Sequence, residues 1–146
     1  MIGIVVAAHG KLAESLVETA RQVVKNNNRV SAVMLAPSDD TELFQERLQH
    51  AVERLDAPQG VLVITDMFGG TPSNVGMTLH AAGKVEVLTG ANLPMLIKAL
   101  QVCSEESDLS IAAQIVKNAG QSAIAVASEV LDITVNAPPA HEGSSE

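Results

Sequence analysis

The sequence predicts an α/β fold, in which a doubly wound, mostly parallel sheet of four strands carries helices on both faces. The first observation is a set of four short apolar runs without polar alternation, the pattern of strands that are covered on both faces. The second is the helix-spaced, amphipathic segment that follows each run. Strands that alternate with helices form parallel sheets with right-handed crossovers. We expect the strand order 2-1-3-4, in which the first and third strands are neighbours.

The apolar runs and the helical stripes alternate along the chain. We expect strands at residues 2–8, 30–35, 60–64 and 85–88. Helical stripes run from Leu12 to Val24, from Phe44 to Leu55, after Pro72, from Pro94 to Leu100 and after Asp108. Asp39, with Glu42 three residues later, resembles a capping box at the start of the second helix. Thr71 and Asn92 stand as N-caps before prolines of the first turn.

The C-terminal part of the chain departs from this alternation. We expect Gly120 to kink or end the helix that begins at Asp108. Residues Leu131 to Val135 alternate like a half-exposed edge strand. The last eleven residues are rich in Pro, Gly, Ser and Glu, and we expect them to be disordered. We therefore predict one domain over residues 1–135 and a flexible polar tail over residues 136–146.

Composition and charge exclude several classes of protein. The chain of 146 residues has the length of one domain and a formal net charge of −8. Nucleic-acid binding is excluded because it relies on basic residues, and two Phe without Tyr or Trp leave almost nothing to stack on bases. No apolar run approaches the ~18 residues of a membrane span, and the first residues lack the basic region of a signal peptide. We therefore expect a cytoplasmic protein.

The single cysteine and the four histidines do not form a metal-binding pattern. Cys103 lies in an apolar segment and is interpreted as a small core residue. His50 falls on the outer side of the second helix, His80 lies near the end of the third, and His141 belongs to the tail. Because no metal-ligand spacing is present, we expect neither a metal nor another cofactor.

Two reactive side chains follow the first and third predicted strands. His9 comes directly after the first strand, and Asp66 follows the end of the third. Ligands of doubly wound sheets bind at the carboxyl ends of the strands, where the strand order reverses, so we expect both side chains on one rim. A carboxylate that accepts a hydrogen bond from one imidazole nitrogen leaves the other nitrogen as a nucleophile. The pair therefore predicts a phosphoryl or acyl acceptor at His9, and the alternative is a structural role for both residues.

A turn-rich loop follows Asp66 and opens the third helix. Gly69 and Gly70 let the backbone turn its N–H groups toward an anion, and a helix N-terminus behind Thr71 favours a phosphate group. An ordinary helix start would use the same residues. The loop is not a nucleotide P-loop, because the lysine of that motif is missing.

Three motifs stand at the ends of predicted strands. They are Ala8-His9-Gly10 after the first strand, the run from Asp66 to Asn74 after the third and the run from Gly90 to Leu96 after the fourth. In this order they resemble the mannose-type IIA components (EIIA) of the bacterial phosphoenolpyruvate-dependent sugar phosphotransferase system, over roughly residues 1–130. The resemblance implies that His9 is phosphorylated to phosphohistidine and that Asp66 orients its ring. It also implies that Gly69, Gly70 and Thr71 hold the phosphoryl oxygens.

The resemblance also implies partners for the chain. The phosphocarrier protein HPr would donate the phosphoryl group, and an EIIB component would accept it and phosphorylate incoming sugar. A membrane permease would be contacted peripherally at most. The family is dimeric and exchanges an antiparallel strand near the C-terminus between subunits, so residues 131–135 are the candidate strand. A net negative charge would steer an acidic face toward a basic carrier protein.

Two features depart from the family pattern, and several alternatives follow. Thr71 stands where many members have Ser, and no EIIB domain follows the IIA region, so EIIB is expected as a separate protein. A stand-alone regulatory EIIA, which reports phosphorylation state without a sugar permease, is the first alternative. A phosphotransfer subunit of dihydroxyacetone kinase also uses a first-strand histidine, although the Gly69–Thr71 loop resembles the sugar-system branch. A receiver domain would need an acidic pair where this chain has Ala7 and Ala8.

Overall fold

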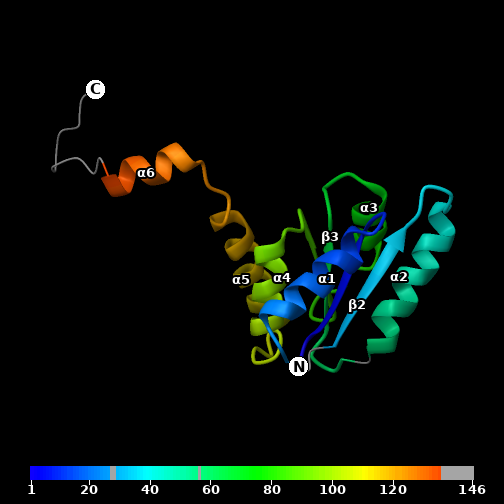
Figure 1. Cartoon of the computed structure of the whole chain (residues 1–146). Coiled ribbons are helices and arrows are strands. Elements are labelled where there is room, and N and C mark those ends of the chain that lie inside the picture. The colour runs from blue at the N-terminus through cyan, green and yellow to red at the C-terminus, as the bar shows by residue number, and fades with distance from the viewer. Residues whose placement is uncertain (27–28, 56, 136–146) are drawn as a thin grey trace.

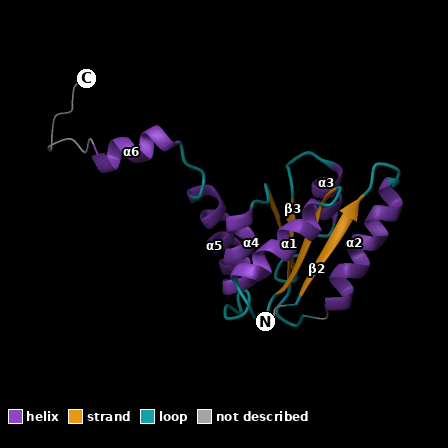
Figure 2. Ribbon diagram, viewed as in Figure 1, coloured by secondary structure: helices purple, strands orange, loops and turns teal. Residues whose placement is uncertain are grey.

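The computed structural model of the chain describes residues 1–26, 29–55 and 57–135. Figures 1 and 2 show the strands together in one sheet, with helices packed around it. The strands are β1 (Gly3–His9), β2 (Val30–Leu35), β3 (Val61–Thr65) and β4 (Val85–Thr89). The helices are α1 (Leu12–Val23), α2 (Thr41–Leu55), α3 (Thr71–Thr78), α4 (Leu93–Val102), α5 (Leu109–Ser122) and α6 (Ala127–Val135). Among the described residues, no helix has both the length and the hydropathy to cross a membrane.

The four strands form one parallel sheet in the order β2-β1-β3-β4, which confirms the predicted fold class and strand order. Ala7 of β1 pairs with Thr65 of β3, and His9 at the end of β1 pairs with Leu35 of β2. Neighbouring parallel strands therefore end at the same rim of the sheet. This rim brings together the residues that follow β1, β2 and β3.

Two apolar layers cover the sheet, one on each face. Ile4, Val6 and Ala8 of β1 belong to the larger core, which α1, α4 and α5 complete. Val5 and Ala7 point to the opposite face, where α2 and α3 cover them. Both faces of β1 are therefore buried, which explains an apolar run without alternation.

Helix α2 starts one residue later than the predicted capping box implies. The carboxylate of Asp40 accepts the main-chain N–H of Leu43 at 2.7 Å and caps the helix. Asp39 does not cap, because its carboxylate accepts the N–H of Ala36 at 2.8 Å and the guanidinium of Arg47 at 2.9 and 3.0 Å. The prediction of Asp39 as the capping residue is therefore wrong.

The starts of α3, α4 and α5 follow the predictions to within one residue. Gly70 is the N-cap of α3 and Thr71 is its first helical residue, so Thr71 is not the cap. Asn92 caps α4 through the N–H of Met95 at 3.0 Å, as predicted. Asp108 caps α5 by accepting the N–H of Ile111 at 3.1 Å.

The C-terminal elements differ most from the predictions. Helix α5 continues through Gly120 to Ser122, and a Cβ at residue 120 would clash with the side chain of Met95 on α4. Glycine at this position therefore permits close packing of two helices rather than ending one. Residues Leu131–Val135 are the last half of α6, so the predicted strand is wrong. A helix satisfies its main-chain hydrogen bonds internally, whereas a strand needs a partner strand.

Cys103 lies at the end of α4 and is fully buried. Burial raises the pKa of its thiol to about 12, so the group stays protonated at neutral pH. The interpretation of Cys103 as a small core residue is confirmed.

Candidate functional site

The imidazole of His9 contacts the carboxylate of Asp66 at the rim of the sheet. His9 is the last residue of β1, and Asp66 directly follows β3, so adjacent strand ends place them together. Nδ1 of His9 lies 2.7 Å from Oδ2 of Asp66, and the main-chain N–H of His9 donates to the same oxygen at 3.0 Å. Because a carboxylate accepts hydrogen bonds, Nδ1 carries the proton and Nε2 presents a lone pair.

The Asp66 carboxylate is held in its ionised form. Burial by itself would raise the pKa of this carboxyl, but hydrogen bonds from the main chain and the ring of His9 outweigh it. The N–H of Met67 also donates to Asp66, at 3.0 Å. The pKa of Asp66 consequently lies below its usual range. The side chain of Asp66 is only 11% exposed, whereas that of His9 is 45% exposed, so the ring is accessible and its partner is sheltered.

The glycine loop lies directly against the histidine ring. Gly69 has a φ of +88°, which a residue with a side chain rarely adopts, and this turn directs the chain into α3. Gly70 is extended and packs so closely that a Cβ there would lie 3.1 Å from Cε1 of His9. No side chain caps the start of α3 within the described residues. The first-turn N–H groups of α3 therefore have no side-chain partner, and the ring of His9 lies beside the residue that precedes them.

A shallow pocket of about 400 Å³ adjoins His9 on the side of β2. Besides His9 and Gly10, it is lined by Thr71, Thr41, Asp39 and residues 35–37. Arg47 ties the loop after β2 down, because its guanidinium donates to the carboxylate of Asp39 and to the carbonyl of Met34 at 2.9 Å. The guanidinium also lowers the pKa of the Asp39 carboxyl, chiefly through their hydrogen bond.

The structure brings together His9, Asp66, Gly70 and Thr71, as predicted, and places Gly69 in the adjoining turn. It adds Asp39 and Thr41, which the sequence reasoning missed as neighbours of His9. One signal was present: both residues follow the end of β2, which shares the rim with β1 and β3.

The other histidines lie away from this site. His50 is exposed on α2, and His80 follows α3, with Nε2 3.6 Å from the carboxylate of Glu86. His141 is outside the described residues. Across residues 1–26, 29–55 and 57–135, no group of three His, Cys, Asp or Glu side chains is arranged to hold a metal.

The arrangement suits attack by an imidazole nitrogen on an electrophile that carries negative charge. Asp66 fixes the tautomer and the orientation of the ring. The uncapped N-terminus of α3 supplies N–H groups and the positive end of a helix dipole beside that ring. Phosphoryl transfer needs mainly such positioning and such donors around the transferred oxygens.

The chain is similar in sequence to IIA components of the phosphotransferase system (PTS). A family model described as the fructose IIA component of the PTS matches residues 3–117. The PTS mannose-specific EIIAB component of Escherichia coli (strain K12) is 30% identical over 106 residues, which cover 72% of this chain and 33% of that protein. The chain thus spans about a third of the length of this relative.

Solved structures show the same fold. The phosphotransferase system component EIIA from Streptococcus agalactiae superposes with a TM-score of 0.79 at 25% identity and covers 88% of this chain and 99% of its own. The PTS IIA protein associated with the fucose utilization operon of Streptococcus pneumoniae has a TM-score of 0.73 at 32% identity, covering 88% and 95%.

Proposed function

The chain belongs to the family of PTS fructose IIA components, and on this premise we propose that it carries a phosphoryl group on Nε2 of His9. Phosphorylated HPr is the donor, and an EIIB component is the acceptor. The single observation that carries the proposal is the 2.7 Å contact between Nδ1 of His9 and Asp66. This contact leaves Nε2 as the nucleophile. The side chain of His9 is 45% exposed to solvent, so a protein partner can reach it.

The transfer exchanges one nitrogen–phosphorus bond for another. The lone pair of Nε2 attacks the phosphorus of the donor's phosphohistidine, and the donor's imidazole leaves with the electron pair of the bond that breaks. The proton on Nδ1 of His9 stays in its hydrogen bond to Asp66, so the new phosphohistidine gains a stabilising carboxylate behind it. In the second transfer, a nucleophilic side chain of EIIB attacks the phosphorus, and Nε2 of His9 leaves with the electron pair of the nitrogen–phosphorus bond that breaks.

The start of α3 is the proposed binding site for the phosphoryl oxygens. Cε1 of His9 lies against Gly70 and is bonded to Nε2, so a phosphoryl group on Nε2 would stand beside this helix end. The N–H groups around Gly69, Gly70 and Thr71, together with the Thr71 hydroxyl, are the donors. Their partial positive charge offsets the charge of the transferred group.

The proposed place of the chain is the middle of a relay. The name of the E. coli relative joins an EIIA and an EIIB part, and the chain matches a third of that protein. In our proposal EIIB passes the phosphoryl group to an incoming sugar of a mannose- or fructose-type transporter. The IIA chain itself meets only phosphorylated proteins, so the sugar is chosen by later components.

Labelling with phosphorylated HPr tests the proposal. We expect one acid-labile phosphate per chain, carried by His9, and none in His9→Ala. The matched control is His80→Ala, which removes another exposed histidine away from the rim and should label fully. Labelling that persists in His9→Ala would overturn the assignment.

Asp66→Asn tests the role of the carboxylate. The amide is nearly the same size, but its NH2 group can donate to Nδ1 and drive the proton to Nε2, which removes the lone pair. We expect phosphorylation to slow by roughly 100-fold or more while the fold is retained, because the wrong tautomer of an oriented imidazole cannot act as the nucleophile. Rapid-quench labelling measures the rate, and a wild-type rate would remove Asp66 from the mechanism.

A further inference from the structure

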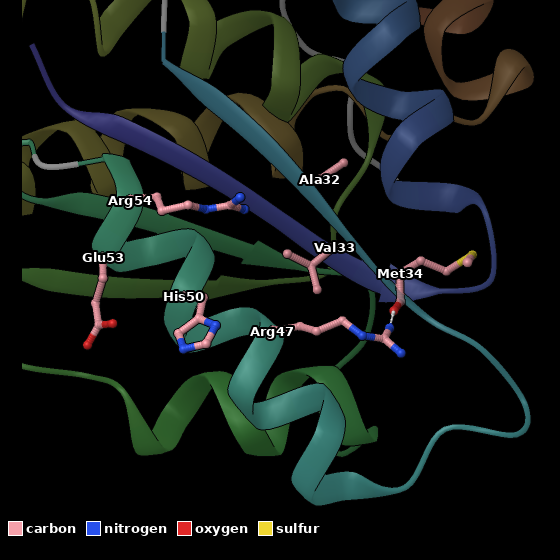
Figure 3. Close-up of a pocket in the computed structure, with 7 residues that line it drawn as sticks. All are labelled: Ala32, Val33, Met34, Arg47, His50, Glu53 and Arg54. Atoms are coloured by element: carbon pink, nitrogen blue, oxygen red, sulfur yellow. Dashed lines mark hydrogen bonds between the residues drawn. The ribbon is translucent and has the colours of Figure 1, made fainter.

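A pocket lies outside the phosphoryl site, between α2 and the outer edge of β2. It has a volume of about 520 Å³ and is lined by Ala32, Val33, Met34, Arg47, His50, Glu53 and Arg54. Figure 3 shows these side chains around the groove between helix and strand. His9, Asp66 and Thr71 do not line it, so it is a separate feature.

One wall of the groove is an open strand edge. β2 is an outer strand of the sheet, with β1 on one side only. Ile4 donates to the carbonyl of Arg29, and Gly10 donates to that of Leu35, so odd-numbered residues of β2 bond to β1. The main-chain groups of Ala32 and Met34 therefore point outward. Met34 already uses its carbonyl as an acceptor for Arg47.

This edge lacks the usual protection against pairing with another strand. The segment Val30–Leu35 has no charged residue and no proline, which are the common means of blunting an exposed edge. Ala32, at its centre, is exposed and has the smallest side chain that a strand normally carries. The side chain of Ala32 therefore adds little bulk beside its outward N–H and C=O groups.

A row of basic side chains forms the other wall. Arg47, His50 and Arg54 are spaced by three and four residues, so they lie on one face of α2, and we call them the basic stripe. Figure 3 shows Arg47 reaching Met34 and the side chain of Arg54 extended from the helix. The carboxylate of Glu53 points away from β2 in the same view. Arg47 is neutralised by Asp39, whereas no ion pair involves Arg54 within the described residues.

From these observations we propose that the groove docks an extended, acidic segment of a partner protein, which adds a strand to β2. This inference goes beyond the proposed phosphoryl transfer. The added strand would bond to the outward groups of Ala32 and the N–H of Met34. Its acidic side chains would face His50 and Arg54 of the basic stripe, because Arg47 is already paired with Asp39.

The spacing of the stripe specifies the pattern of the segment. His50 and Arg54 are four residues apart, which is ~6 Å along a helix. Two residues of an extended strand span ~6.6 Å and point to the same face. Acidic residues at alternate positions, as in Asp-x-Asp, would thus meet both side chains. The intervening residue would face the opposite side, where Ala32 and Met34 present their own side chains (Figure 3).

The binding experiment uses the full chain and a fluorescein-labelled peptide with the core Val-Asp-Val-Asp-Val. We expect saturable anisotropy with the wild type and binding weakened about tenfold by Arg54→Glu, because a charge pair becomes a repulsion. Lys117→Glu, an equal change of charge on α5, should bind as the wild type does. The same peptide with Lys in place of Asp should not bind.

Ala32→Pro tests strand addition separately from charge. Proline at this position removes an outward N–H and leaves the hydrogen bonds to β1 intact, so an edge strand tolerates it. We expect peptide binding to fall by roughly fivefold or more, with an unchanged circular dichroism spectrum and unchanged phosphorylation of His9. Normal phosphorylation with no peptide effect would overturn the docking site and leave the proposed function standing.

Other outcomes would also overturn the docking proposal. One is the absence of binding by the acidic peptide at roughly 1 mM, a concentration that would reveal even weak affinity. Another is equal binding of the acidic peptide to wild type, Arg54→Glu and Ala32→Pro. A third is self-association of the wild type that Ala32→Pro abolishes, because β2 of a second copy would then be the occupant.

Discussion

The ring of His9 is held from two sides by residues of one loop. Asp66 binds Nδ1 at 2.7 Å, and Gly70 leaves just enough room for the edge of the ring at Cε1. The two contacts have different physical origins, since one is a charge-assisted hydrogen bond and the other is the absence of a side chain. Substitutions at the two loop glycines separate steric placement of the ring from backbone strain.

Gly70→Ala should mainly lower activity, whereas Gly69→Ala should mainly lower stability. A Cβ at residue 70 would lie 3.1 Å from the ring, and the backbone there, with φ of −80°, accepts alanine. We expect phosphorylation to slow by roughly tenfold with little loss of stability, because small misplacements of reacting groups are costly. Gly69→Ala should instead cost about 1–2 kcal/mol of stability, because its φ is +88° and nothing lies near its Cβ.

Labelling rates and urea denaturation measure the two effects independently. If Gly70→Ala labels at the wild-type rate, the ring does not depend on the space that this glycine provides. If Gly69→Ala is as stable as the wild type, its backbone conformation is not strained.

At the scale of single residues, the sequence predicted the contact that follows from the order of the strands. It missed the contact that depends on the length and direction of one side chain. His9 and Asp66 were predicted as neighbours because they follow adjacent strands, and the structure confirms this. The pairing of Asp39 with Arg47 was not predicted. It joins a loop to the second turn of a helix, and no periodic pattern in the sequence specifies where a long guanidinium side chain will bind.

At the scale of elements, the cores of helices and strands were predictable, and their ends were less so. The apolar run of β2 matches residues 30–35, the predicted cap Asn92 is confirmed, and α5 starts directly after Asp108, where a helix was expected. Asp39 and Asp40 stand side by side, and both have the residue type of a cap. Asp40 is the cap because the carboxylate of Asp39 already accepts hydrogen bonds from Arg47 and from the N–H of Ala36.

The loop between β2 and α2 should lose stability in acid through Asp39. The guanidinium of Arg47 and the N–H of Ala36 hold the pKa of the Asp39 carboxyl below its usual range. Its ionised form therefore stabilises the fold fully above about pH 4. As the pH falls below that, the unfolded chain takes up the proton first, and this stabilisation disappears as the folded pKa is passed.

Asp39→Asn isolates this pH dependence. We expect the variant to be less stable than the wild type at pH 6, and the difference in free energy of unfolding to shrink toward pH 3. Urea denaturation at several pH values measures it, and Asp40→Asn, at a helix cap without an arginine partner among the described residues, serves as the comparison. A difference between Asp39→Asn and the wild type that is constant with pH would contradict the assignment.

At the scale of the molecule, the alternation of strands and helices was enough to predict the order of the sheet and its two covered faces. The C-terminal region was not predictable in the same way. The residues from Leu131 to Val135 alternate in polarity, yet they form part of α6. Five residues hold too little periodicity to separate a strand from a helix, and Figure 1 shows α6 extending away from the sheet that would have to pair with such a strand.

The projecting end of the chain leads to a prediction about assembly. Ile124 is 77% exposed and Val126 is 55% exposed, and both lie between α5 and α6. Burying such apolar surface against a second copy would be favourable, so we expect a dimer in sedimentation velocity. Val126→Asp should shift the protein toward the monomer, because a charge would enter the contact. Val23→Asp, at a site that is 62% exposed at the end of α1, should leave the dimer intact. A wild-type monomer, or equal disruption by both variants, would contradict this prediction.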